Sequence, residues 1–338
     1  MRLDDDAEFI VDAVRRHLNP AADMSRFDWL YRGNPDGEAQ AWIAEDGASG
    51  KPIGIAAAFP RRIYLHGRVN HGWVLGDFCV DGNYRTLGPA LQLQRACLAG
   101  IAATGAGIAY DLPGGEMSPL YRRLGIAPFG LVRRLAKPLR VDGRVPPGLP
   151  SIVRAPLSRA GNDLLALLDA RHGVAGDVDV AFEAGPCGPE YSELATRVAS
   201  GHSFCLQRAP SYLDWRYLHA PHRRYRLLAA RRRGELVGYA VLDRDGEVGW
   251  IVDLFGIEDG PAIRSLVAAA VACFREERAA TVAVAILDGH PWIADLTRLG
   301  FSPREATPVV VCTGDGRALT PEGARGGPWL FVQGDRES

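Results

Sequence analysis

The sequence has few of the features that mark metal sites, disulfide scaffolds or membrane spans. Its six cysteines lie far apart without a Cys-x-x-Cys pair, so we expect buried thiols in a reducing compartment and no disulfide or zinc framework. No apolar run approaches the roughly 20 residues that a membrane span needs. The first residues, MRLDDDAEF, are acidic where a secretory signal would be basic and then apolar. We therefore expect a cytoplasmic protein without a membrane span.

An excess of charge of either sign is also missing. Lys and Arg number 39 against 40 Asp and Glu, and this balance argues against a nucleic-acid partner or a polybasic membrane surface. The eight His residues form no His-x-x-x-His or His-Glu-x-x-His pattern, so we expect no metal. There is no Gly-x-Ser-x-Gly nucleophile motif. What remains is a chain of 338 residues, 47% hydrophobic, whose length suits two α/β domains.

Five short segments occur twice in the same order. The number of residues that separates the two members of a pair decreases steadily along the chain. Any one match alone would be chance, whereas an ordered set indicates a duplicated domain with a trimmed second copy. The Pro- and Gly-rich residues 141–160 suit a linker between the copies. The matching pairs are Phe27–Tyr31 with Leu213–Tyr217, Gly54 with Gly238, Gly72–Val74 with Gly249–Ile251, Asp77 with Asp253, and Arg123–Ile126 with Arg298–Phe301.

Hydrophobic periodicity predicts the same order of elements in both copies: antiparallel strands, a helix, a strand, a helix and a strand, with a leading helix over 5–18 in the first copy. The fold class is therefore α/β (α+β), with a mixed, mostly antiparallel sheet flanked by helices in each copy. Further helices are expected over 88–103, 117–124, 260–277 and 291–299. Strands are expected over 41–46, 53–59, 62–66, 72–80, 107–112, 126–135, 225–230, 235–242, 248–255, 280–287 and 307–312.

The segment between Val80 and Ala90 has the pattern of an anion-binding turn. A strand ends near Val80 and a long helix starts near Gly88, so unpaired N–H groups and the positive end of the helix dipole point at one spot. Such a spot binds phosphate, and Gly88 allows the close approach. Pro89 suits a first helical turn. Taken alone, the segment fits an ordinary strand-to-helix loop equally well.

Two motifs here resemble those of the GNAT superfamily of N-acetyltransferases. Arg85-x-x-Gly88-x-Ala90 is similar to the family's first signature, and Leu120-Tyr121-x-x-Leu124-Gly125 is similar to the second. They occur in the family's order, with a predicted helix and strand between them. The resemblance covers about 40–135 by motif and about 220–312 through the repeat. It implies an acyl-CoA-binding GNAT-like domain over 1–140, the linker 141–160, and a degenerate GNAT-like domain over 161–338.

The resemblance also implies residue roles in the first domain. Tyr121 would be the general acid for the departing thiolate, which suits a phenol of pKa ~10; a core tyrosine is the alternative. The co-substrate would be acetyl-CoA or another acyl-CoA. Its pantetheine arm would run along Phe78, Cys79 and Val80, and its pyrophosphate would be held by Arg85, Thr86, Leu87, Gly88, Pro89 and Ala90.

The general base has two candidates. Asp77, on the strand beside the expected thioester, is the first, and Glu116 is the second. The second copy also has an Asp, Asp253, at the position of Asp77, so a shared structural role is the competing interpretation. The stretch Gly114-Gly115-Glu116 departs from the family pattern, which carries an Asn shortly before the Tyr.

The second copy lacks the residues for chemistry. Its loop Ile257–Ala262 carries two carboxylates, which would repel a pyrophosphate, and Leu296 stands where Tyr121 stands in the first copy. We expect this copy to be a structural or acceptor-binding half. The paired Asp28-Trp29 and Asp214-Trp215 segments line an acceptor cleft on one interpretation and supply aromatic packing on the other.

The sequence thus predicts an N-acyltransferase, most simply an N-acetyltransferase, that moves an acyl group from acyl-CoA to a primary amine. The acceptor would be a small molecule, a sugar or a peptide. One alternative is a non-catalytic acyl-CoA-binding or scaffold protein, and another is a transferase that uses acyl-carrier protein or aminoacyl-tRNA as donor. Nothing in the sequence fixes the oligomeric state.

Overall fold

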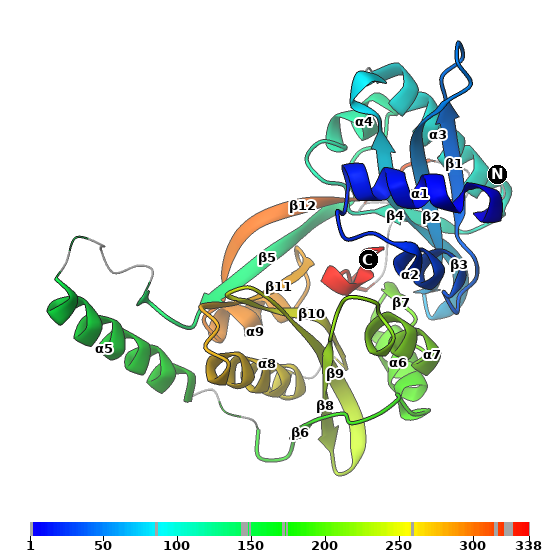
Figure 1. Cartoon of the computed structure of the whole chain (residues 1–338). Helices are drawn as coiled ribbons and strands as arrows, with labels where there is room; N and C mark the ends of the chain where they lie inside the picture. The colour runs from blue at the N-terminus through cyan, green and yellow to red at the C-terminus, as the bar shows by residue number, and fades with distance from the viewer. Residues whose placement is uncertain are drawn as a thin grey trace.

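The computed structural model describes residues 3–84, 87–142, 148, 150–170, 173, 175–257, 260–313, 317–320 and 327–337. We call 3–142 the N-terminal half and 150–337 the C-terminal half; they form the upper and lower lobes in Figure 1. The chain begins with α1 (Leu3–His17), whose first turn carries three Asp residues that suit the helix dipole. Its buried face, Ala7, Ile10, Val11, Ala13 and Val14, has the spacing of the predicted helix and packs into the main core.

The N-terminal half is an antiparallel meander followed by one parallel crossover. The short α2 (Met24–Phe27) precedes the meander β1 (Gln40–Glu45), β2 (Pro52–Leu65) and β3 (Arg68–Val80). Then α3 (Leu87–Ala103) leads to β4 (Ile108–Asp111), which runs parallel to β3. The half ends with α4 (Ser118–Arg123) and β5 (Gly130–Pro138). The α1 helix contacts β2 and β3, and α3 contacts β1, β2 and β3.

The strands predicted over 53–59 and 62–66 are one strand, β2, which continues through Pro60. The carbonyl oxygen of Pro60 accepts hydrogen bonds from Asn34 and Arg61 rather than from β3. In an antiparallel strand the N–H and C=O of one residue point to the same side, so the missing N–H of Pro60 also faces away from β3. The β2–β3 ladder therefore loses no hydrogen bond at this proline.

The C-terminal half repeats this order of elements after a helical insertion. Its last seven elements, β8 through β12 with α8 and α9, match β1 through β5 with α3 and α4. The α5 helix covers the second half of the predicted linker 141–160 and extends away from the body of the molecule (Figure 1). The elements are α5 (Ser151–Ala170), β6 (Asp179–Phe182), α6 (Glu190–Gly201), β7 (Phe204–Leu206), α7 (Pro210–Leu213), β8 (Arg226–Arg232), β9 (Glu235–Asp245), β10 (Val248–Gly256), α8 (Gly260–Glu276), β11 (Thr281–Leu287), α9 (Trp292–Arg298) and β12 (Ser302–Thr313).

The two halves exchange their last strands. The sheet has the order β1-β2-β3-β4-β12-β5-β11-β10-β9-β8-β6, with β7 paired to β2. Thus β12 lies beside β4 of the N-terminal half, and β5 lies beside β11 of the C-terminal half. The mixed, mostly antiparallel sheet flanked by helices confirms the predicted fold class. The unit boundaries 1–140 and 161–338 stay a proposal, in which each unit takes its last strand from the other.

Two tryptophans join the halves with nearly two-fold geometry. Trp29 and Trp215 lie on matching π-helical turns, Asp28–Arg32 and Asp214–Leu218. Each indole N–H donates to the backbone carbonyl of the other tryptophan at 2.8 Å, and the rings stack 5.0 Å apart. The paired segments therefore pack on each other at the seam between the halves, as the aromatic-packing interpretation predicts.

Candidate active site

The N-terminal half has an opening between two diverging parallel strands. β3 and β4 pair only from Gly72 to Val74 and from Ile108 to Tyr110. Beyond these residues β3 stays paired with β2 and Asp111 of β4 stays paired with β12, and we call the region between these two strand ends the opening. The carboxyl ends of parallel strands in an α/β sheet are the usual place for a ligand, and here the N-terminus of α3 and the α4 helix flank them.

A β-bulge lies on β3 at the edge of this opening. Asp77 and Phe78 together oppose the single residue Ala56, and Asp77 has a φ of +42°. A bulge leaves a residue outside the ladder and re-aims the local backbone, and such bulges are frequent beside active sites. The side chains of Phe78 and Val80 belong to the cluster that packs under α3.

Cys79 faces the opposite side, toward α1, with its Sγ 3.9 Å from the carbonyl oxygen of Ala13. Burial raises the pKa of this thiol to about 12, so it carries no thiolate at neutral pH. Of the three predicted pantetheine residues, Phe78 and Val80 therefore pack on the α3 side of the sheet, and Cys79 packs on the α1 side. All six cysteines are unpaired, as the sequence predicts.

The helix N-terminus lies where the sequence predicts a phosphate site. The helix α3 starts at Leu87 and runs for 17 residues, so its first N–H groups have no helical partner. Gly88 is exposed, and a Cβ placed there would meet no atom within 4 Å. Pro89 stands in the first turn, as expected, followed by the small Ala90. Arg85 and Thr86 lie outside the described residues.

Tyr121 projects from α4 into the space between α3 and the end of β4. Its ring is 2% exposed and packs with Ile126, Val310 and Cys312. Its hydroxyl donates to Asp111 Oδ2 at 2.6 Å and accepts from Gln94 Nε2 at 3.2 Å. Burial and the Asp111 carboxylate raise the pKa of Tyr121 well above its ordinary value, so the phenol keeps its proton.

Asp111 is a site residue that the sequence analysis missed. It is the last residue of β4 and is half-buried. Burial raises the pKa of its carboxyl to about 7, although the hydrogen bond from Tyr121 opposes the shift. The only sequence signal was an acidic residue at the carboxyl end of a predicted parallel strand, where ligand-binding residues gather.

Asp77 is fully engaged by neighbouring side chains. Both of its carboxylate oxygens accept hydrogen bonds of 2.9 Å from Arg26, and Tyr31 donates to it at 2.9 Å. Asp253, its counterpart, is bound in the same way by Arg208 at 3.0 and 3.3 Å and by Tyr217 at 2.9 Å. Both halves thus use the Asp to fix a buried Arg and Tyr onto the sheet.

Glu116, the second candidate base, lies in the turn that leads into α4, and its side chain is exposed. It is close in sequence to Tyr121 but does not belong to the hydrogen-bonded group of Tyr121, Asp111 and Gln94. The structure therefore gathers Tyr121 with Asp111 and not with either predicted base.

The matching opening in the C-terminal half is filled by the end of the chain. β10 and β11 pair only from Val248 to Ile251 and from Thr281 to Val284. Beyond them, Leu287 N donates to the carbonyl of Phe331 at 2.9 Å, and Val332 forms a bridge with Ile286. These contacts place the middle of the tail (residues 327–337) between the diverging strands, while Trp329 and Leu330 pair with Phe204 of β7.

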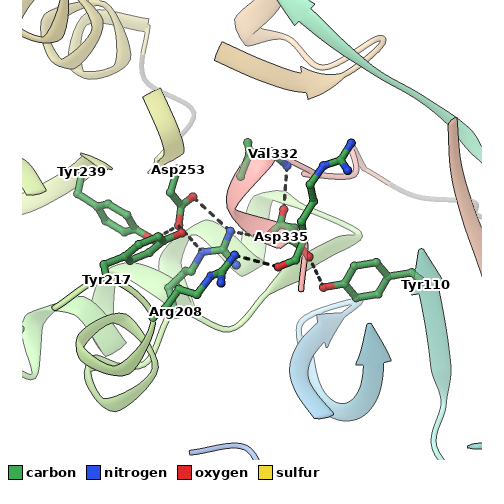
Figure 2. A network of polar contacts seen from close by, with 9 residues as sticks. Tyr110, Arg208, Tyr217, Tyr239, Asp253, Val332 and Asp335 are labelled. Atoms are coloured by element: carbon green, nitrogen blue, oxygen red, sulfur yellow. Dashed lines mark hydrogen bonds and ion pairs between the residues drawn. The ribbon is translucent and has the colours of Figure 1, made fainter. Parts of the chain in front are cut away.

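Buried polar contacts hold the tail in this place, as Figure 2 shows. Asp335 accepts from Arg208 at 2.5 Å, and Arg208 also binds Asp253 of β10. Gly334 packs so closely on Asp253 and the hydroxyl of Tyr217 that a Cβ would not fit. The opening between β10 and β11 therefore has no room for a pantetheine arm. The residues Glu258 and Asp259 of the predicted acidic loop lie outside the described residues, while Leu296 is buried in the core.

The last tail residues lie between β3 and β4 of the N-terminal half, just beyond the paired residues of these strands, where Arg336 also donates to the carbonyl of Leu112 at 3.4 Å. Tyr110 of β4 donates to the carbonyl of Asp335 at 2.9 Å, and Arg216 donates to the carbonyl of Arg336 at 3.0 Å. The side chain of Glu337 lies against Gly76 of β3. The sequence predicted only that the Trp329–Phe331 segment docks somewhere.

A cavity of about 550 Å³ opens at the seam between the halves. Arg26, whose guanidinium holds Asp77, lines it from the N-terminal half together with Trp29. Tyr225 and Trp250 line it from the C-terminal half. Because Arg26 lines this cavity and also binds Asp77 of β3, the cavity is connected to the β3 bulge through that ion pair.

Two further searches concern the described residues alone. None of the helices in those ranges is long and apolar enough to cross a membrane. No group of three or more His, Cys, Asp or Glu side chains that could hold a metal ion occurs among them.

The fold is similar to solved structures of N-acetyltransferases. Family models and curated sequences gave no match. A GCN5-related N-acetyltransferase from Anabaena variabilis matches with a TM-score of 0.64 and 14% identity, over 92% of this chain and 71% of that one. A protein of unknown function from Enterococcus faecalis, described as a probable N-acyltransferase, matches with a TM-score of 0.64 and 13% identity, over 92% and 70%. One from Kribbella flavida, a GCN5-related N-acetyltransferase, matches at 0.60 and 14%, over 92% and 69%. The chain therefore has the GNAT fold, as its two motifs predict.

Proposed function

We propose that the N-terminal half transfers an acyl group, most simply acetyl, from acyl-CoA directly to a primary amine. The observation that carries this proposal is the opening between β3 and β4, flanked by the N-terminus of α3 and by Tyr121 of α4. The N-terminus of a 17-residue helix suits a pyrophosphate, because it presents unpaired N–H groups and a positive dipole end. The diverging strands suit an extended pantetheine arm.

Each side chain has a task in this reaction. The first turn of α3, with Gly88 leaving its N–H groups uncovered, binds the pyrophosphate. Phe78 lies in the bulge, where the backbone leaves the ladder with β2, and Val80 follows it where the ladder resumes opposite Gly54. Tyr121 supplies the proton for the departing thiolate, which a neutral phenol can do in a site that excludes water. Burial of the cysteine thiols disfavours a covalent acyl-cysteine intermediate at Cys79.

We propose a structural role for Asp77 rather than a role as base. Its carboxylate already accepts three hydrogen bonds, two of them from a guanidinium, so its oxygen atoms are engaged by Arg26 and Tyr31 rather than by an acceptor amine. Glu116 stays as a candidate base because its exposed carboxylate is free to approach an acceptor or a water molecule. The seam cavity is the proposed place for the acceptor, with Trp29 and Trp250 as its apolar walls.

Release of free thiol from acetyl-CoA, measured across a panel of amines, tests the proposal. We expect release that depends on one class of amine and a stoichiometric amide product by mass spectrometry. Binding of acetyl-CoA without turnover on any amine would favour the non-catalytic alternative. Turnover only with an acyl-carrier protein or aminoacyl-tRNA would change the donor but keep the site.

A further inference from the structure

We propose that Asp111 is a positioning residue that controls whether the hydroxyl proton of Tyr121 is available to the leaving group. In this assignment the protonated carboxyl of Asp111 donates to Tyr121 and turns the phenol proton toward the opening, whereas the ionised carboxylate captures that proton. The consequence for turnover rests on the proposed function. The dependence of the Tyr121 hydroxyl direction on the protonation of Asp111 does not rest on that function.

The hydrogen bonds of Tyr121 account for this control. A phenol has one proton to donate and two lone pairs to accept with. Gln94 fills one lone pair, and the proton goes to Asp111 Oδ2 at 2.6 Å. When Asp111 is ionised, the single hydroxyl proton of Tyr121 points at the Asp111 carboxylate and not at a leaving group. A phenol locked onto a buried carboxylate is a weak acid toward a thiolate, because its ionisation would place two negative charges side by side.

Protonation of Asp111 reverses the direction of this hydrogen bond. The carboxyl O–H then fills the second lone pair of the Tyr121 oxygen, and the phenol proton is free. When the amine nitrogen forms its bond to the acyl carbon, the C–S bond breaks and sulfur keeps the electron pair. The nitrogen releases its surplus proton to water, which leaves a neutral amide. The sulfur takes the proton of Tyr121, the phenolate takes the proton of Asp111, and the resulting carboxylate is reprotonated from water. No oxidant or reductant takes part.

The surroundings keep both forms of Asp111 accessible near neutral pH. Glu337 from the tail raises its pKa, and Arg336 from the tail and Tyr121 from α4 lower it, while burial is the largest cause. Its remaining titratable neighbours are Cys97 of α3 and Cys312 of β12, whose own pKa values are raised by burial. Both thiols are neutral at pH 7 and do not compete for the proton. Burial sets the pKa of Asp111 at about 7.

The pH dependence of turnover distinguishes positioning from packing. Asp111→Asn cannot ionise, yet its amide N–H donates to Tyr121 as the protonated carboxyl does. We expect the variant to keep kcat within about fivefold of the wild-type value at pH 6 and its ratio to wild type to rise about tenfold per pH unit above pH ~7. The ratio cancels the ionisation of the amine. Asp111→Ala, which donates nothing, should lose more than about tenfold at pH 6.

Unfolding gives a readout that needs no activity. The folded state raises the pKa of Asp111 above the ordinary 3.8, so between pH ~4 and ~7 it binds a proton that the unfolded chain releases. The free energy of unfolding of the wild-type protein therefore falls as the pH rises through this window. Asp111→Asn has no carboxyl group to titrate, so its free energy of unfolding does not fall for this reason. The urea midpoint of the variant should rise relative to wild type between pH 5 and pH 8.

These outcomes separate the two proposals. A midpoint difference that does not change with pH, or an Asp111→Asn profile with the wild-type decline, overturns the role of Asp111. The expected midpoint change without turnover in any variant supports the coupling and overturns the acyltransferase instead.

Discussion

Tyr121→Phe should lower kcat by about 10²- to 10³-fold while changing the KM for acetyl-CoA by less than about threefold. The substitution removes one oxygen atom and keeps the ring that packs on Ile126, Val310 and Cys312. It deletes the proton donor but leaves α3 and the diverging strands as they are. Steady-state thiol release at saturating amine measures the effect.

Tyr239→Phe is the matched control. Tyr239 is equally buried, and its hydroxyl donates to Asp253 at 3.1 Å in the C-terminal half, outside the proposed site. This variant should keep the wild-type kcat. If Tyr121→Phe behaves like Tyr239→Phe, Tyr121 is a core tyrosine and the proton comes from elsewhere.

The second large effect concerns the two buried Arg–Asp pairs. Asp77→Asn should lower the free energy of unfolding by about 3–5 kcal/mol, because it leaves the buried guanidinium of Arg26 without its countercharge. Asp253→Asn should cost less, because the buried guanidinium of Arg208 keeps its ion pair with Asp335. Urea unfolding followed by tryptophan fluorescence measures both.

The two variants, Asp77→Asn and Asp253→Asn, also test whether Asp77 takes part in the reaction. As a structural residue, Asp77 should carry a stability cost at least as large as that of Asp253, and the folded Asp77→Asn protein should keep the wild-type dependence of kcat/KM on pH. A variant that folds as stably as wild type yet loses about 10²-fold in kcat would instead make Asp77 the base.

Local patterns predicted the elements well for a physical reason. The helix over 88–103 and the strands over 72–80 and 248–255 follow from the spacing of apolar residues, and the structure has them within a few residues. The end of the strand before Gly88 and the start of the helix beside it follow from the same spacing of apolar residues. Two short motifs then identified the fold, although the identity to solved structures is only 13–14%.

Long-range pairing was beyond local patterns. β5 lies beside β11 and β12 rather than β4, and no feature of its own residues, Gly130–Pro138, distinguishes these neighbours. The position of the tail depends on Asp335 meeting Arg208, which is 127 positions earlier in the chain. Asp111 escaped notice because its raised pKa comes from burial, which a single sequence does not display.

On our proposal that the C-terminal half binds no acyl-CoA, the tail takes the place of a ligand in that half and stabilises its fold. The tail supplies the C-terminal half with backbone pairing at Ile286 and Leu287 and with a buried carboxylate, Asp335, for Arg208. In the N-terminal half the tail contacts Gly76 of β3 and the carbonyl of Leu112 after β4 through its last two described residues, Glu337 and Arg336. We therefore expect one acyl-CoA site per chain.

The stoichiometry of acetyl-CoA binding tests this account most directly. Isothermal titration of the full chain should give one site, lost in Gly88→Asp and kept in the matched Gly260→Asp. Each substitution places a carboxylate at a helix N-terminus, where it stabilises the helix but repels a pyrophosphate. We expect at least about tenfold weaker binding for the first and no change for the second. Two sites per chain, or binding that Gly260→Asp removes and Gly88→Asp preserves, would contradict the assignment of the N-terminal half as the acyl-CoA-binding half.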